Sequence, residues 1–288
     1  MSLSALLIVL VAALLHATWN YWVKKLAGGP ELIWMFSTLS VILYAPALCY
    51  MLLLGDVKFN VQTVGMICGS GMLHLAYFLT LQLGYRHGEL SLVYPIARAT
   101  GPLLATLFAV VVLGEQISIQ VVAGGMCIVI GVLFLSGGLR SRRLSKGPSM
   151  LFGLGTGVLI GCYTVWDAYA VSVALVAPLV LDYFANLFRG VALMPYALKR
   201  KPALISLWRR HKLPVFGIAL LSPLAYILVL YVYTYTPVVY VAPLREVSVL
   251  FTVMLGAVLL KESEVASRMT WGVLIVVGIG LLLSLIHI

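Results

Sequence analysis

Long apolar runs, separated by short polar or glycine- and proline-containing breaks, dominate the pattern of this 288-residue chain. A helix needs about 20 apolar residues to cross the hydrocarbon core of a bilayer. Ten runs have about this length, near residues 3–23, 31–54, 61–84, 90–113, 119–137, 149–170, 177–198, 213–234, 238–260 and 268–286. The pattern therefore predicts an all-α integral membrane protein with ten transmembrane helices. The longer breaks, 138–148 and 199–212, are expected to be basic linkers.

The composition and the absence of certain motifs narrow the class of protein to which this chain can belong. Charged residues make up 10% of the chain, whereas a soluble domain carries roughly 25%. The four cysteines lie inside apolar runs without a CxxC or a histidine at metal spacing, so neither a disulfide framework nor a zinc site is indicated. No phosphate-binding glycine loop supports direct use of ATP. We therefore expect no cofactor, no metal and no nucleic-acid partner.

The lysines and arginines lie almost entirely on one side of the predicted membrane. Breaks after odd-numbered runs hold fifteen of them, and breaks after even-numbered runs hold only Lys58. The other three, Arg98, Arg189 and Arg245, lie within runs. By the positive-inside rule, the odd-numbered loops face the cytoplasm and both termini lie outside. The sequence thus predicts a multi-pass protein of the cell (inner) membrane.

The two halves of the chain repeat at an offset of 147 residues. The rare residues that match are Trp19-Asn20 with Trp166-Asp167, Arg98 with Arg245, and Glu115 with Glu262. Each repeat holds five runs, an odd number, so the two copies must insert with opposite topology, as in many secondary transporters. We expect five-helix repeats at 1–138 and 149–288, joined by a basic cytoplasmic linker at 139–148.

Several short segments carry a family resemblance. They are His16-Ala17-Thr18-Trp19-Asn20, Tyr94-Pro95 with Arg98, Gly114-Glu115 and Lys261-Glu262. With these segments the whole chain resembles EamA-type permeases of the drug/metabolite transporter superfamily. The resemblance implies a transporter rather than an enzyme, with two inverted five-helix repeats around a central cavity. Smaller multidrug relatives carry a membrane-embedded glutamate where this chain has His16, with Tyr163 as its repeat mate, which puts glutamate-driven cation antiport in doubt.

Two repeat-related arginines are the leading candidates for substrate contact. A charge inside hydrocarbon is costly and usually faces a bundle interior or a wet cavity. The guanidinium groups of Arg98 and Arg245 would keep their charge when desolvated and bind a carboxylate or phosphonate with two hydrogen bonds. The alternative is structural pairing with Asp167, with Glu246 or with backbone carbonyls.

Other candidate substrate-binding residues lie on matched helix faces. His16 and Asn20 are four residues apart, as are Tyr163 and Asp167, so each pair shares one helix face. The neighbouring aromatic residues Trp19, Trp166 and Tyr94 complete this set. The alternative for all of them is hydrogen bonding between helices.

Two carboxylates and four helix-breaking residues suggest coupling and gating. Asp167 and Glu246 are candidate proton carriers, because burial favours the protonated form of a carboxyl group. The alternatives are a static salt bridge from Asp167 to an intramembrane arginine and a local pair between Glu246 and Arg245. The candidate gating points are Pro95, Gly101, Pro102 and Pro243, since proline kinks helices.

Four further polar residues leave their role open. His74, in the middle of the third run, is either a titrating group or a satisfied core residue. Asp182, Asn186 and Arg189 share one face of the seventh run. This face either lines a cavity or forms hydrogen bonds to neighbouring helices.

These observations together predict a secondary active transporter, a permease or exporter. Its expected substrate is a small polar metabolite, an organic anion or zwitterion such as an amino acid or phosphonate, carried by alternating access. The alternatives are a flippase of a lipid-linked head group, a multidrug or cation exporter, and a scaffold without substrate. Besides the substrate and the lipid bilayer no partner is expected, and a monomer is predicted because duplication supplies internally what smaller relatives obtain by dimerising.

Overall fold

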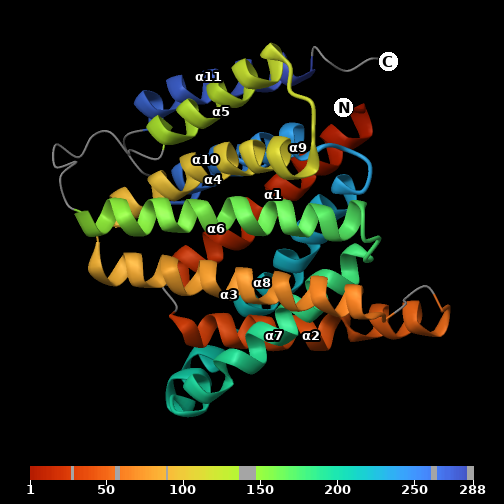
Figure 1. Ribbon diagram of the computed structural model, residues 1–288. Helices are drawn as coiled ribbons and strands as arrows, with labels where there is room; N and C mark the ends of the chain where they lie inside the picture. The colour runs from red at the N-terminus through yellow and green to blue at the C-terminus, as the bar shows by residue number, and fades with distance from the viewer. Residues whose placement is uncertain (27–28, 56–58, 89, 136–146, 261–264, 284–288) are drawn as a thin grey trace.

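A computed structural model describes residues 1–26, 29–55, 59–88, 90–135, 147–260 and 265–283. Every regular element within these residues is an α-helix. The helices, shown in Figure 1, are α1 (Leu3–Leu26), α2 (Pro30–Leu53), α3 (Val61–His87), α4 (Leu90–Leu113), α5 (Ile119–Leu135), α6 (Gly147–Ser172), α7 (Pro178–Leu198), α8 (Lys201–Tyr233), α9 (Val238–Arg245), α10 (Val247–Leu260) and α11 (Val265–Leu283).

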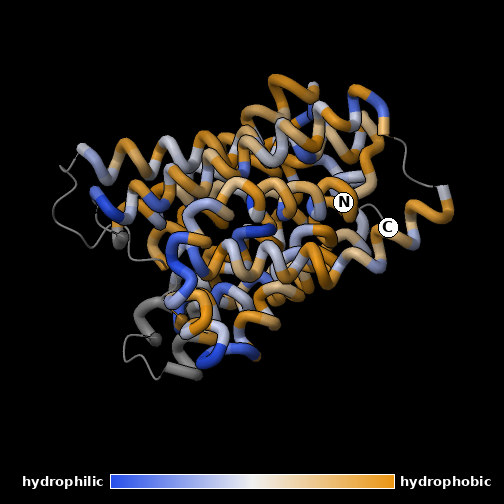
Figure 2. Tube along the Cα trace, turned by 90° about the horizontal axis from the view of Figure 1, so that it is seen from below, coloured by the Kyte–Doolittle hydropathy of each residue, from blue (hydrophilic) through white to orange (hydrophobic). Residues whose placement is uncertain are grey.

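The helix surfaces are apolar, as a protein embedded in lipid requires. Large side chains such as Leu53 and Ile119, each 86% exposed, point outward, and the tube in Figure 2 is predominantly hydrophobic along most helices. A soluble protein rarely leaves such surface in water. Six of the described helices are long and apolar enough to cross a membrane. The predicted all-α, multi-pass membrane protein is confirmed at this level.

The helix starts follow local sequence signals. α2, α7 and α8 each carry proline in the first turn, where its missing N–H is not needed. Asn60 caps α3, because its side-chain oxygen accepts a hydrogen bond of 2.7 Å from the backbone N–H of Thr63. Glu115, just after α4, accepts hydrogen bonds from the first backbone N–H groups of α9, those of Val238 at 2.8 Å and Val239 at 2.9 Å. A carboxylate of the first half thus caps a helix of the second half.

Two expected elements differ from the structure. The ninth run is not one helix, since α9 ends at Arg245 and α10 starts at Val247, with Glu246 between them. The stretch 199–212 is not a linker, because α8 begins at Lys201 and continues into the eighth run through a kink at His211. Leu204 is buried and Leu207 packs on a core cluster of the bundle, and such packing stabilises a helix there. The predicted linker 139–148 lies almost entirely outside the described residues.

The helices of the two halves interleave. α6 packs on α3 and α4, and α1 packs on α8, α9 and α10. α2 packs on α7 of the other half, and α5 packs on α11, side by side at one end of the bundle in Figure 1. Contact between α5 and α11 is backbone to backbone: a Cβ added at Gly278 would lie 2.6 Å from the carbonyl oxygen of Gly124. Small residues that let helices approach closely are typical of membrane bundles.

Candidate functional site

A cavity of about 140 Å³ lies at the centre of this arrangement. It is lined by α1, α3 and α4 of the first half and by α6, α7, α8, α9 and α10 of the second. Its ionisable and aromatic lining residues are His16, Trp19, His74, Tyr77, Arg98, Tyr163, Asp182, Arg189, Tyr226 and Arg245. Five of the predicted site residues therefore meet here, namely Arg98, Arg245, His16, Trp19 and Tyr163.

Arg98 is held by groups from both halves. Its Nη1 lies 3.2 Å from Oε1 of Glu246, and its Nη2 lies 2.9 Å from Nε2 of His16. Its Nε donates to the hydroxyl of Tyr94 at 3.3 Å. The structure thus contains the alternative pairing of Arg98 with Glu246, and it places Glu246 against Arg98 rather than in a local pair with Arg245. The carboxylate reaches the arginine because the break between α9 and α10 falls at Glu246.

Arg245, the repeat mate of Arg98, has a different environment. Its Nη1 lies 3.5 Å from the hydroxyl of Tyr233, and its guanidinium carbon lies 5.5 Å from the ring centroid of Tyr226. Among the residues that the structure describes, no carboxylate oxygen lies within 4 Å of Arg245. Aromatic rings and phenols stabilise a guanidinium less than an anion does. Arg245 therefore presents a charged group to the cavity that has no ion-pair partner in the described part of the chain.

Asp167 is fully buried and pairs with a histidine. Its Oδ2 lies 2.8 Å from Nε2 of His74 and 2.5 Å from the hydroxyl of Tyr226. Its Oδ1 has no hydrogen-bond partner. No salt bridge to an arginine forms within the described part of the chain. The sequence left the role of His74 open between a titrating group and a satisfied core residue, and it did not indicate that Asp167 is the partner of this histidine.

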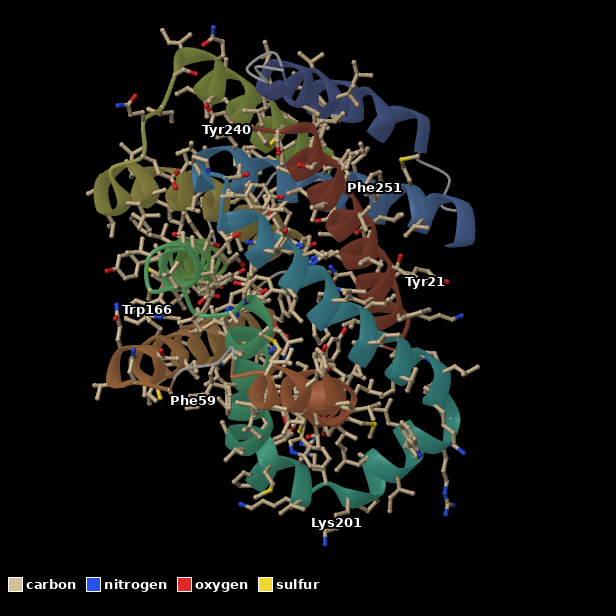
Figure 3. All side chains as sticks on the ribbon, turned by 90° about the vertical axis from the view of Figure 1, so that its right-hand side faces the viewer. Tyr21, Phe59, Trp166, Lys201, Tyr240 and Phe251 are labelled. Atoms are coloured by element: carbon tan, nitrogen blue, oxygen red, sulfur yellow. The ribbon has the colours of Figure 1, made fainter. Side chains whose placement is uncertain are left out.

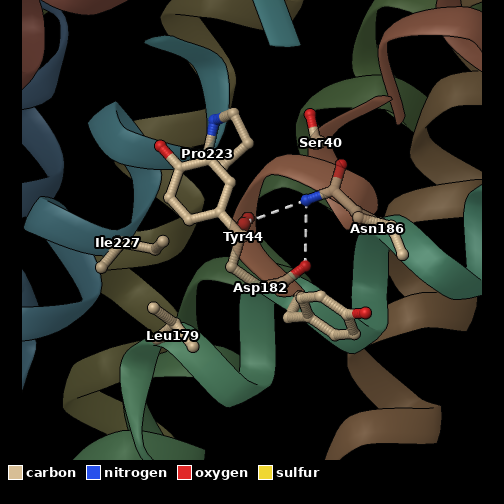
Figure 4. Close-up of a pocket in the computed structure, with 9 residues that line it drawn as sticks. Ser40, Tyr44, Leu179, Asp182, Asn186, Pro223 and Ile227 are labelled. Carbon is tan, nitrogen blue, oxygen red and sulfur yellow. Dashed lines mark hydrogen bonds between the residues drawn. The ribbon is translucent and has the colours of Figure 1, made fainter. Parts of the chain in front are cut away.

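Three polar residues of α7 form a chain along the cavity wall. Nδ2 of Asn186 donates to Oδ2 of Asp182 at 2.9 Å, and Nη2 of Arg189 donates to Oδ1 of Asn186 at 3.0 Å. All three line the cavity. Figure 4 shows Asp182 and Asn186 also facing Tyr44 of α2 and Pro223 of α8. The polar face of α7 therefore both lines the cavity and contacts neighbouring helices.

Three predicted binding residues do not line the cavity. Trp166 lies against α3, where its indole N–H donates to the carbonyl oxygen of Met66 at 2.9 Å and its ring fills the space beside Gly69; Figure 3 places it near the outside of the bundle. Tyr94 reaches the site only through Arg98. Asn20 is absent from the lining.

The predicted gating residues lie on two helices. Pro95, Gly101 and Pro102 are inside α4, which stays helical from Leu90 to Leu113, and Gly101 packs on Ile160 of α6. Pro243 lies in α9, three residues before Glu246 at the break. Pro102 and Pro243 line a second void of about 80 Å³ between α4, α5 and α9. Free volume beside two helix-breaking residues is compatible with movement there.

Comparisons with known proteins agree with this architecture. The model of the EamA-like transporter family matches residues 3–137 and again residues 147–285. A solved crystal structure of another protein is 19% identical, with a TM-score of 0.72, over 98% of this chain and 99% of that one. At this identity the likeness shows the fold alone. No curated protein matches the sequence.

Proposed function

The chain belongs to the EamA-like transporter family, and we propose that its central cavity binds and transports a small organic anion or zwitterion, such as an amino acid or a phosphonate. The observation that carries this proposal is Arg245, which lines the cavity without a carboxylate beside it. A desolvated guanidinium is costly unless an anion compensates it. A substrate carboxylate or phosphonate that binds Arg245 with two hydrogen bonds would supply that anion.

The rest of the lining supports a zwitterion in particular. Arg98 is already compensated by Glu246, so it holds the two halves together more than it attracts a second anion. Asp182 offers a carboxylate to the same cavity and is bonded only to a neutral amide. An amino group would complement Asp182 while the acidic group of the same molecule complements Arg245. A purely cationic drug would meet Arg98, Arg189 and Arg245 in the lining, which disfavours the multidrug alternative.

Alternating access between inverted repeats is the mechanism we propose. The packing supports it, because the contacts of α6 with α3 and α4 have counterparts in those of α1 with α8, α9 and α10. A cavity between two such repeats opens to either side when one repeat rocks against the other. We further propose a monomer in the cell (inner) membrane with odd-numbered loops in the cytoplasm. A flippase of a lipid-linked head group remains the second candidate for the same cavity.

The test is a thermal-shift screen of the purified protein with glycine, alanine, 2-aminoethylphosphonate, methanesulfonate and tetraphenylphosphonium. We expect stabilisation by an anion or zwitterion, and loss of this stabilisation in Arg245→Ala. A charge-assisted hydrogen bond contributes about 1.5–3 kcal/mol, so the variant should bind at least about tenfold more weakly. Arg209→Ala, on the surface part of α8, is the matched control and should bind normally. Stabilisation by tetraphenylphosphonium alone would overturn the proposal.

A further inference from the structure

The two histidines of the cavity have partners of opposite charge. Nε2 of His16 lies 2.9 Å from Nη2 of Arg98, whereas Nε2 of His74 lies 2.8 Å from Oδ2 of Asp167. A neighbouring cation disfavours an added proton on an imidazole, and a neighbouring carboxylate favours it. His16 can also accept the hydrogen bond from Arg98 only if Nε2 is unprotonated. Of the two histidines, His74 is therefore the one placed to gain a proton.

The carboxylate beside His74 is incompletely satisfied. Asp167 is 0% exposed, and both of its hydrogen bonds go to Oδ2 while the buried Oδ1 has none. A buried carboxylate with an unpaired oxygen is costly, and a cation in contact with it offsets that cost. Protonation of His74 would supply the cation without moving any side chain.

Glu246, the other carboxylate that the sequence pointed to for proton coupling, lacks this capacity. Glu246 is bound by the guanidinium of Arg98, which does not lose its proton under physiological conditions. Among the described residues Oε2 of Glu246, like Oδ1 of Asp167, has no hydrogen-bond partner, but the charge of Glu246 is already balanced and the pair holds no exchangeable proton. In the His74–Asp167 pair, by contrast, the partner is an imidazole, which can take up a proton on its second ring nitrogen and release it again. Of the two carboxylates that the sequence pointed to for proton coupling, the geometry favours Asp167.

Groups from every neighbouring helix surround His74. From α6, the Tyr163 ring stacks on its imidazole at 4.2 Å between centroids, next to Asp167 itself. From α8, the hydroxyl of Tyr226 lies 3.4 Å from Nε2. The remaining ionisable groups that line the same cavity are Tyr77 on α3, Arg98 on α4, Asp182 and Arg189 on α7, Arg245 on α9, and His16 on α1. The arginines oppose a charge on His74, and none of the hydrogen bonds or ion pairs described joins one of them to it.

We infer that His74 and Asp167 form a proton-binding pair open to the cavity, with Asp167 as the fixed counter-ion and His74, 14% exposed, as the group that exchanges the proton. Nε2–H of neutral His74 donates to Asp167, so the lone pair of Nδ1 takes up the arriving proton and the ring becomes an imidazolium. Release of that proton restores the neutral ring.

This pair is connected to the proposed substrate arginine through one residue. The hydroxyl of Tyr226 donates to Asp167, and its ring lies 5.5 Å from the guanidinium carbon of Arg245. The inference rests on the proposed transport function, because a proton site coupled to this cavity has a use only in a transporter. It deepens that function by naming the coupling ion as H⁺.

The test follows the protonation of His74 directly, without any substrate. The full-length protein, labelled with ¹⁵N-histidine, is placed in lipid nanodiscs and titrated by NMR from about pH 5 to about pH 9, a range that brackets the histidine transition. His74→Gln identifies the signal of His74. We expect this signal to titrate within the range. A His74 signal that stays in one form throughout would overturn the inference.

Two variants separate a proton site from a structural contact. Asp167→Asn removes the counter-ion and should lower the midpoint by at least about one pH unit. Tyr226→Phe removes a hydrogen-bond donor from the carboxylate, leaves it more basic, and should raise the midpoint. Opposite shifts support the pair, and Tyr226→Phe keeps the test decisive if Asp167→Asn does not fold. An unchanged midpoint in the folded variants would refute it.

The control keeps this test apart from that of the proposed function. Glu246→Gln removes a carboxylate that Arg98 already binds, so it should move the His74 midpoint by less than about half a pH unit. If the His74 signal does not titrate while anion binding still depends on Arg245, the proton site is refuted and the substrate site is supported. If the His74 signal titrates but no anion binds, the substrate site is refuted and the proton site is supported.

Discussion

At the residue scale, the repeat-related arginines differ in what compensates them. Arg98 contacts Glu246 and His16, whereas within the described residues Arg245 contacts phenols and aromatic faces. The offset of 147 residues makes the two positions equivalent in sequence. Their environments differ because the helix break falls next to Arg245, and the carboxylate at that break turns to the other arginine. We therefore propose a structural role for Arg98 and a ligand-binding role for Arg245.

This difference predicts a stability effect specific to Arg98. Arg98→Ala leaves Glu246 buried without a cation, and breaking a buried ion pair costs about 3–5 kcal/mol. Arg245→Ala leaves no carboxylate unpaired and should cost much less. In detergent, Arg98→Ala should therefore lower the unfolding temperature strongly, and Arg245→Ala should lower it only weakly. The double variant Arg98→Ala, Glu246→Gln should recover part of the loss; equal losses in the two single variants would contradict this assignment.

At the scale of elements, α5 and α11 are joined by close backbone contact. A Cβ at Gly278 would lie 2.6 Å from the carbonyl oxygen of Gly124, and a Cβ at Gly124 would lie 2.9 Å from that of Gly278. Neither helix can yield at such a contact without separating along its length. Gly280, two residues further along α11, has nothing within 4 Å of its would-be Cβ and faces outward.

We therefore expect Gly278→Leu to separate α5 from α11 and to lower the unfolding temperature and the yield of folded protein. Overpacking of a close contact costs about 1–3 kcal/mol. Gly280→Leu adds the same volume to the same helix on its open side and should behave like the unmodified protein. Size-exclusion chromatography and thermal unfolding in detergent measure both variants. Equal behaviour of the two leucine variants would show that the contact does not hold the helices.

At the scale of the whole molecule, orientation in the membrane is the property to test. From the count of basic residues we propose that the basic start of α8, which contains Arg209, faces the cytoplasm and that the N-terminus lies outside. Single cysteines at Ser2 and Arg209, both exposed, are made in a background without the native cysteines. In intact cells a membrane-impermeant maleimide should label the cysteine at position 2 and not the one at position 209. Labelling of position 209 alone would show that the protein has the opposite orientation.

Much of the fold could be predicted because lipid imposes a simple rule on sequence. A spanning segment has to be apolar over about 20 residues, so hydropathy alone locates most helices. The rule fails where packing within the protein decides. The basic segment from Lys201 is helical and buries Leu204, and the break of the ninth run at Glu246 lets that residue reach Arg98. Neither feature is visible as a local pattern.

The sequence by itself determined the membrane class, the repeat, the family resemblance and the presence of charges inside the bilayer, since each depends on residue type and spacing along the chain. Only the tertiary structure decided which charges meet. It pairs Arg98 with Glu246 and Asp167 with His74, leaves Arg245 without a carboxylate, and turns Trp166 away from the cavity. Pairing across helices depends on how each helix is rotated and displaced against its neighbours, and the close packing of α1, α3, α4, α6 and α8 sets those rotations.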